Sequence, residues 1–207
     1  MTIRAVLFDF GGVLYKTPDR QWMKKWQRFL GLGKDEVISS IIVSQDESPY
    51  VQAVMEGRIP ESEIWERMGR RWRLSPMLVR WLKHNTMSRQ RLNREVASFL
   101  ASLRPTYRTG ILSNAGSDAR SMFTSIFGFD RLVDEMIISA EEGIAKPDER
   151  IYQIALDKLG VEAGEAVFLD DLAVNVKAAR QLGMKAVQFQ GASQAISEIR
   201  ALLAGGS

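Results

Sequence analysis

The stretch Val6-Leu7-Phe8-Asp9-Phe10-Gly11-Gly12-Val13-Leu14 decides how the rest of the chain is interpreted. In it, an apolar run of strand length ends in one carboxylate, and two glycines follow. Open α/β sheets place their chemistry at the carboxyl ends of buried strands, and glycines let the backbone approach a small charged ligand. Taken alone, the stretch is also typical of a strand that ends in an ordinary turn. Residues further along the chain favour the first interpretation.

The composition excludes several classes of protein. The chain has 207 residues, enough for one core or for one core with a small second domain. A formal charge of only +3 does not indicate a nucleic-acid-binding protein. The absence of cysteine excludes disulfides, thiolate metal sites and a cysteine nucleophile. The sequence shows neither a signal-peptide pattern nor an apolar run near the ~20 residues that span a bilayer. We therefore expect a cytoplasmic protein that binds neither nucleic acid nor membranes. We expect this protein to be a monomer or a homodimer.

Strand and helix patterns alternate at the start of the chain and again after Pro105. The strands are expected at residues 2–8, 107–113, 135–139, 166–169 and 185–189, and the helices at 117–127, 148–159 and 173–182, with a final helix that ends at about residue 203. Such alternation predicts a parallel sheet that is covered by helices. We therefore expect an α/β fold with a Rossmann-like, doubly wound sheet, formed by residues 1–16 and 104–207.

Residues 17–103 have a different character, because strand patterns disappear and helical patterns follow one another. Helices are expected to begin near residues 18, 34, 49, 60 and 76, with a last one capped by Ser88. This segment contains all five tryptophans, at positions 22, 26, 65, 72 and 81. Helically spaced aromatic residues usually form the core of a small bundle, and one or two of these could face a pocket. The segment is predicted to be a helical cap domain inserted after the first strand.

Polar and charged side chains follow the predicted strands at the point where each strand ends. The candidates are Asp9, the pair Ser113-Asn114, Lys146 before Pro147, and the pair Asp170-Asp171. The carboxyl ends of parallel strands meet at one edge of a sheet, so these groups can converge there. Each feature also has an ordinary structural explanation as a turn, a helix start or a loop. Their occurrence at successive strand ends makes coincidence a poor explanation.

These residue types suit phosphoryl transfer. Carboxylates are the ligands that Mg²⁺ prefers, and three converging carboxylates need a cation or a proton to offset their repulsion. A carboxylate such as Asp9 can act as a nucleophile and form an acyl phosphate. Lys146 can neutralise an anionic substrate, while Ser113 and Asn114 can bind phosphate oxygens.

The chain resembles the haloacid dehalogenase-like (HAD) hydrolases along nearly its whole length. The matching blocks are residues 8–14, Ile111-Leu112-Ser113-Asn114, Gly143-Ile144-Ala145-Lys146-Pro147-Asp148, and Val167-Phe168-Leu169-Asp170-Asp171 with Asn175. The helical insert falls where the first type of cap domain sits in this family. The resemblance implies a hydrolase that uses Mg²⁺ and acts on a small phosphorylated metabolite, for example a sugar phosphate.

The resemblance also implies a role for each matched residue. The metal would be bound by Asp9, by the main-chain carbonyl of Gly11 and by Asp171. Asp170 and Asn175 would support the metal or Lys146. The nucleophile would be Asp9, and Lys146 would neutralise both it and the phosphoryl group, which Ser113 and Asn114 would bind.

One position departs from the family pattern. Phosphatases of this family usually carry a second Asp two residues after the nucleophile as general acid and base, but here Gly11 stands there. The chain could then be slow, restricted to good leaving groups, or served by a cap residue such as His84. Two alternatives stay open, a 2-haloacid dehalogenase that uses Asp9 without metal, and a catalytically weak binding or regulatory protein.

Overall fold

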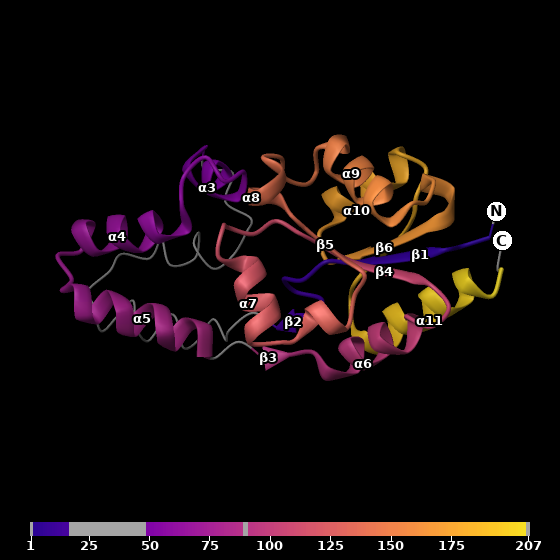
Figure 1. The fold of residues 1–207 in the computed structure, drawn as a ribbon, viewed down its shortest axis with the longest axis horizontal. Coiled ribbons are helices and arrows are strands. Elements are labelled where there is room, and N and C mark those ends of the chain that lie inside the picture. The colour runs from indigo at the N-terminus through magenta and orange to yellow at the C-terminus, as the bar shows by residue number, and fades with distance from the viewer. Residues whose placement is uncertain (1, 17–48, 89–90, 206–207) are drawn as a thin grey trace.

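A computed structural model describes residues 2–16, 49–88 and 91–205 (Figure 1). Its centre is a five-stranded sheet with the order β5-β4-β1-β6-β7, in which every neighbouring pair is parallel. The strands are β1 (Ala5–Phe8), β4 (Arg108–Ser113), β5 (Glu135–Ile138), β6 (Ala166–Asp170) and β7 (Lys185–Gln188). The predicted Rossmann-like α/β fold is confirmed.

Helices cover both faces of this sheet (Figure 1). One face carries α9 (Glu149–Leu159) and α10 (Ala173–Gln181), and the other carries α6 (Arg94–Leu103), α7 (Ala119–Ser125) and α11 (Ala192–Leu203). Alternate residues of β1 serve the two cores: Val6 and Phe8 face the cluster with α6, α7 and α11, while Leu7 faces the cluster with α9 and α10. A strand buried on both faces needs a continuous apolar run, which explains why the opening stretch does not alternate.

The segment that connects the insert to the sheet differs from the prediction. Ser88 caps no helix, because α5 (Pro76–Ser88) runs up to it and α6 begins only at Arg94. Between them lies β3 (Arg91–Leu92), which pairs antiparallel with β2 (Tyr15–Lys16). Two-residue strands carry no readable periodicity, so the sequence did not indicate this pair. Because α6 packs into the same apolar cluster as Phe8, it lies with the sheet, and the division into two domains at residue 103 stays a prediction.

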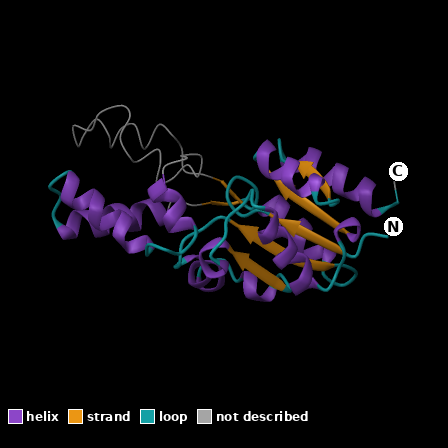
Figure 2. Ribbon diagram, turned by 90° about the horizontal axis from the view of Figure 1, so that it is seen from above, coloured by secondary structure: helices purple, strands orange, loops and turns teal. Residues whose placement is uncertain are grey.

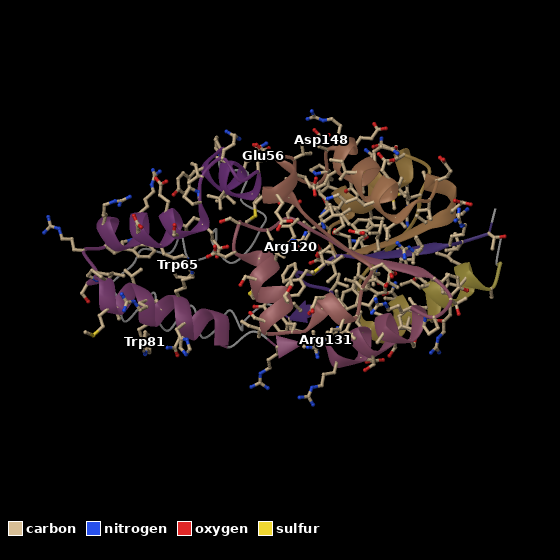
Figure 3. The ribbon with its side chains drawn as sticks, viewed as in Figure 1. Glu56, Trp65, Trp81, Arg120, Arg131 and Asp148 are labelled. Carbon is tan, nitrogen blue, oxygen red and sulfur yellow. The ribbon has the colours of Figure 1, made fainter. Side chains whose placement is uncertain are left out.

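The described part of the insert consists of three helices: α3 (Pro49–Met55), α4 (Glu61–Arg71) and α5. The two helices predicted from residues 18 and 34, with Trp22 and Trp26, lie outside the described residues. Trp65 is buried in a small apolar cluster between α4 and α5, and Trp72 packs against that cluster. Trp81 is 40% exposed and points away from it (Figure 3). In the described segment, Trp65 and Trp72 therefore serve as core.

The insert lies beyond the carboxyl ends of the strands, whose arrows point towards α4 and α5 (Figure 2). It approaches the core at that edge in three places, one of which is the loop after β4, where a Cβ on Gly116 would come within 2.7 Å of Glu61 Oε2. Gly57, which comes just after α3, packs against the core helix α8 (Ser139–Glu142). A Cβ on Gly57 would come within 2.2 Å of the Ala140 carbonyl oxygen. Lys83 of α5 forms an ion pair of 3.3 Å with Asp118, just before α7. No helix among the described residues is long and apolar enough to cross a membrane.

Candidate active site

The carboxyl edge of the sheet brings the predicted residues together. Phe8 lies in register with Ile111 of β4 and with Leu169 of β6, so these strands end at the same level. Asp9 follows β1 directly, and its backbone N–H continues the ladder by donating to the Leu169 carbonyl at 2.8 Å. Ser113 ends β4 and Asp170 ends β6. The apolar strands therefore carry these polar groups to one buried point.

Lys146 occupies the centre of this group. Its ammonium nitrogen donates to Asp9 Oδ1 at 2.7 Å, to Asp170 Oδ2 at 2.7 Å and to the Leu112 carbonyl at 2.9 Å. The Lys146 side chain is only 2% exposed, and the Phe168 ring lies beneath the ammonium. An ammonium has three N–H donors, and here each has an acceptor. Lys146 is therefore a fixed positive charge against the Asp9 carboxylate.

Asp170 holds Lys146 and the start of α10 in place. Its Oδ1 accepts from the Leu172 N–H at 2.8 Å, and both of its oxygens accept from the Asn175 amide at 3.1 Å. The Asn175 carbonyl in turn accepts from the hydroxyl of Tyr152, a fully buried residue on α9. With both oxygens used inside the protein, Asp170 is better placed to position Lys146 than to bind a metal directly.

The carboxylate of Asp171 is open to a ligand. It is half-buried, and no hydrogen bond from another residue of the described chain reaches its carboxylate. Its position depends on Gly12, which has a φ of +82° and lies so near that a Cβ there would come within 2.3 Å of Asp171 Oδ2. One oxygen from each of Asp9, Asp170 and Asp171 lies within 4.8 Å of the other two. The three form a cluster of the kind that holds a metal ion.

The Asn114 side chain forms two hydrogen bonds with the loop that carries Lys146. Its Nδ2 donates to the Lys146 carbonyl and its Oδ1 accepts from the Lys146 N–H, both at 2.8 Å. Its side chain therefore positions Lys146, and contact of Asn114 with a phosphoryl group stays a prediction. The hydroxyl of Ser113 has no partner among the described residues, which leaves it available to a ligand.

The charges of the site are not balanced. Burial raises the pKa of Asp9 to about 7, with a further increase from Asp170 and an opposing decrease from Lys146. Burial and then Asp170 also raise the pKa of Asp171. Burial alone would lower the pKa of Lys146, but its two carboxylate partners outweigh burial and raise it. Three carboxylates against one ammonium leave two negative charges, which is the deficit that a divalent cation would fill.

The positions of Gly11 and His84 decide whether a side chain could donate a proton to the leaving group. A Cβ at Gly11 would meet nothing within 4 Å, so the space that a general acid would occupy is present without the acid. His84 is exposed on α5, and no contact within the described residues connects it with Asp9. The steric role of Gly12 and the hydrogen bond of the Tyr152 hydroxyl could not be predicted from the sequence, because both depend on contacts between distant segments.

Comparisons with known proteins identify relatives of this chain. The family model described as haloacid dehalogenase-like hydrolase matches residues 3–183. Mouse acyl-CoA dehydrogenase family member 10 is 28% identical over 97% of this chain, which spans only 19% of that protein's length. A sesquiterpene phosphatase of Aspergillus oryzae is 26% identical over 98% of this chain and 97% of its own.

A solved structure has the same fold. It is a HAD family enzyme of Bacteroides thetaiotaomicron in complex with magnesium and inorganic phosphate. Its TM-score with this chain is 0.71 at 20% identity, over 90% of this chain and 93% of that one. The motifs, the fold and the match over residues 3–183 lead to one conclusion: the chain belongs to the haloacid dehalogenase-like hydrolases.

Proposed function

We propose that this hydrolase is a Mg²⁺-dependent phosphatase that transfers the phosphoryl group of a small phosphomonoester to Asp9. The observation that carries the proposal is the pairing of a buried Asp9 with Lys146 at 2.7 Å, beside the available carboxylate of Asp171. The phosphatase from Aspergillus oryzae and the magnesium and phosphate complex of the Bacteroides enzyme support the same chemistry.

The donor set fits magnesium. The ligands would be carboxylate oxygens of Asp9 and Asp171 and the main-chain carbonyl of Gly11, with Asp170 and Asn175 as support. Oxygen donors of this kind suit Mg²⁺, and the two uncompensated negative charges match its charge. When bound, the ion neutralises charge on the phosphoryl oxygens.

The chain's own residues supply the rest of the mechanism. A carboxylate oxygen of Asp9 forms a bond to phosphorus while the bond from phosphorus to the leaving oxygen breaks. Lys146 stays charged beside the reacting oxygen and offsets the negative charge of the phosphoryl group, to which the Ser113 hydroxyl donates. Water then attacks phosphorus in the aspartyl phosphate, which frees Asp9 and releases inorganic phosphate. Because Gly11 provides no acid, substrates with good leaving groups should react fastest.

A phosphate-release assay tests the proposal directly. Purified protein would be offered a broad panel of phosphomonoesters with Mg²⁺, with EDTA, and as the Asp9→Asn variant. We expect release that needs Mg²⁺ and falls on the order of 10⁴-fold or more in the variant, because the nucleophile is lost. No release from any member of the panel would refute the proposal.

The same assay separates the alternatives. A 2-haloacid dehalogenase would keep its activity in EDTA and release halide, but its carboxylate substrate would be repelled by the two negative charges of the cluster that Lys146 does not offset. A binding or regulatory protein would be stabilised by a phosphorylated ligand and show no turnover. Sugar phosphates as substrates and a cytoplasmic location stay predictions.

A further inference from the structure

A cavity of about 690 Å³ lies within the insert, between α4, α5 and the turn that joins these two helices. This volume falls within the range of about 300–1,000 Å³ for pockets that bind small molecules. All described residues of its wall lie between Ser62 and Lys83, so helices of the insert form the wall and no residue of the catalytic cluster belongs to it. We call it the basic cavity, after its cationic residues Arg70, Arg73, Arg80 and Lys83.

The charge of this wall is strongly positive. Four of its described residues are cationic, whereas Glu66 is the single acidic residue among them. Glu66 forms an exposed pair with Arg70 at 3.4 Å, and Lys83 pairs with Asp118 of the core at 3.3 Å. These two carboxylates therefore account for two of the four cations.

The other two cations, Arg73 and Arg80, are available to a ligand. Both are exposed, and neither forms a hydrogen bond or an ion pair with any part of the chain that the structure describes. A guanidinium has five N–H donors in a planar fork, which fits the oxygens of a carboxylate, a sulfonate or a phosphate. The wall therefore offers unused donors for an anionic group.

The backbone at Arg73 is unusual for an arginine. Arg73 has a φ of +52°, and no other described residue except glycine has a positive φ. The Arg73 N–H donates to the Arg70 carbonyl at 3.3 Å, and the next N–H, of Leu74, donates to the Gly69 carbonyl at 2.9 Å. These bonds end α4 in a Schellman motif, whose left-handed position usually carries glycine or asparagine. Because the Arg73 side chain has no partner, the described fold does not account for an arginine at this position.

Apolar side chains complete the wall of the basic cavity. Trp65 of α4 lies between the two helices (Figure 3), and Leu74, Pro76 and Val79 line the cavity with it. Leu74 and Val79 are only partly buried against the small apolar cluster of the insert. A ligand that covers them gains from burial of apolar surface while its charged group meets the guanidinium groups. Charge and apolar surface together match an amphiphilic anion.

We propose that the basic cavity binds a small amphiphilic anion, with its anionic head at Arg73 and Arg80 and its apolar body against Leu74 and Val79. The site is additional to the active site and does not depend on the proposed phosphatase function, because its described wall and the catalytic cluster share no residue. Its ligand is held by charge and apolar contact and undergoes no reaction there.

Calorimetric titration with naphthalene-2-sulfonate in EDTA tests the inference. This probe joins a fixed negative charge to an aromatic body, and 2-naphthalenemethanol is its neutral counterpart. In EDTA the catalytic cluster keeps its two uncompensated negative charges and repels the anion. We expect the sulfonate to bind at least about ten-fold more tightly than the alcohol, because charge-assisted hydrogen bonds are the stronger ones. Its affinity should fall as salt is added.

Two outcomes of the titration would overturn the inference. Equal affinities of the sulfonate and the alcohol would show that the arginines do not bind the head. Binding of the sulfonate that requires Mg²⁺ would place the anion at the catalytic cluster.

Variants locate the probe in the basic cavity. Arg73→Asn removes the charge and suits a φ of +52°, so the thermal midpoint should not fall while the affinity for the sulfonate falls about ten-fold. A purely structural role of Arg73 would instead lower the midpoint and leave the affinity unchanged. Glu66→Gln removes the acid of the wall and should change the affinity in the opposite direction, by about two- to three-fold.

Arg80→Gln, at an exposed position of α5, is the second test of the anionic head and should also weaken binding of the sulfonate. Arg94→Gln is the matched control, because Arg94 is exposed at the start of α6 and does not line the basic cavity. Unchanged affinity in both Arg73→Asn and Arg80→Gln, or an equal loss in Arg94→Gln, would overturn the assignment of the cavity.

Discussion

The catalytic cluster and the cavity beside α3 share a wall but differ in what they leave available to a ligand. In the cluster, negative charge exceeds positive charge, and Asp9, Asp171 and Ser113 keep unused capacity. In the cavity between α3 and the loops 143–150 and 172–175, polar and apolar groups line the wall together, and Glu56 and Asp148 are each paired with an arginine. The comparison shows that the uncompensated charge lies at the sheet edge, whereas the charged groups at the contact between insert and core are already paired.

The largest effect is expected from an acid at position 11, because this substitution changes the chemistry of the cluster and leaves the cavity unchanged. Gly11→Asp introduces a side chain where a Cβ meets nothing within 4 Å. We expect kcat for alkyl phosphates to rise by about 10²–10⁴-fold, the usual contribution of general acid catalysis. For 4-nitrophenyl phosphate, whose leaving group needs no proton, the increase should be much smaller.

The control for that variant is Gly11→Asn, which has the same shape and no acidic proton. An equal increase with Asn, or no increase with Asp on any alkyl phosphate, would show that the missing proton donor does not limit the rate.

Removal of the Lys146 ammonium, which Asp9 and Asp170 share, should destabilise the cluster. Lys146→Met leaves Asp9 and Asp170 buried without their ammonium partner. Removing one partner of a buried pair costs about 3–5 kcal/mol of unfolding free energy, and phosphate release should be lost as well. Urea unfolding monitored by circular dichroism measures the first effect. Lys158→Met, which removes a more exposed pair with Glu142, should cost less than about 1 kcal/mol.

The two adjacent glycines should respond differently to the same small change. Gly12→Ala forces an L-residue to a φ of +82° and pushes a methyl group into the Asp171 carboxylate. We expect a loss of about 1–2 kcal/mol in unfolding free energy, together with weaker Mg²⁺ binding in a calorimetric titration. Gly11→Ala has open space and should change stability by less than about 0.5 kcal/mol. Equal effects of the two variants would contradict the placement of Asp171 against Gly12.

The smallest expected effect concerns the paired charges at the cavity rim. Asp148 caps α9 by accepting from the Arg150 N–H, and the Arg150 side chain and that N–H lower the pKa of Asp148 from 3.8 to about 2. Asp148→Ala should cost about 0.5–2 kcal/mol at pH 7. A lowered folded-state pKa means that this stability is present above pH 3.8 and is lost as the pH falls towards about 2.

Urea unfolding of both proteins at several pH values measures that difference. Asp157→Ala, at the other end of α9, should change stability by less than about 0.5 kcal/mol and serves as the control. A difference for Asp148→Ala that does not shrink between pH 4 and pH 2 would contradict the role of the ionised cap.

Most of the cluster could be predicted from the sequence, because parallel strands carry their last residues to one edge. The apolar run before Asp9 and the run before Asp170 identify both strand ends without any knowledge of packing. The bond of Asn114 to the Lys146 backbone could not be predicted, since a side chain that suits phosphate also suits a carbonyl and an N–H. The cavity was equally unpredictable, because Met55 and Val174 lie 119 positions apart and meet only through docking of the insert.

The most direct test of the central claim is the mass of the peptide that contains Asp9 after rapid acid quenching during turnover in Mg²⁺. We predict that this peptide carries one phosphoryl group, which disappears as substrate is exhausted and never forms in EDTA. Phosphate release without any phosphorylated peptide, or with the phosphoryl group on another residue, would contradict the assignment of Asp9 as the nucleophile.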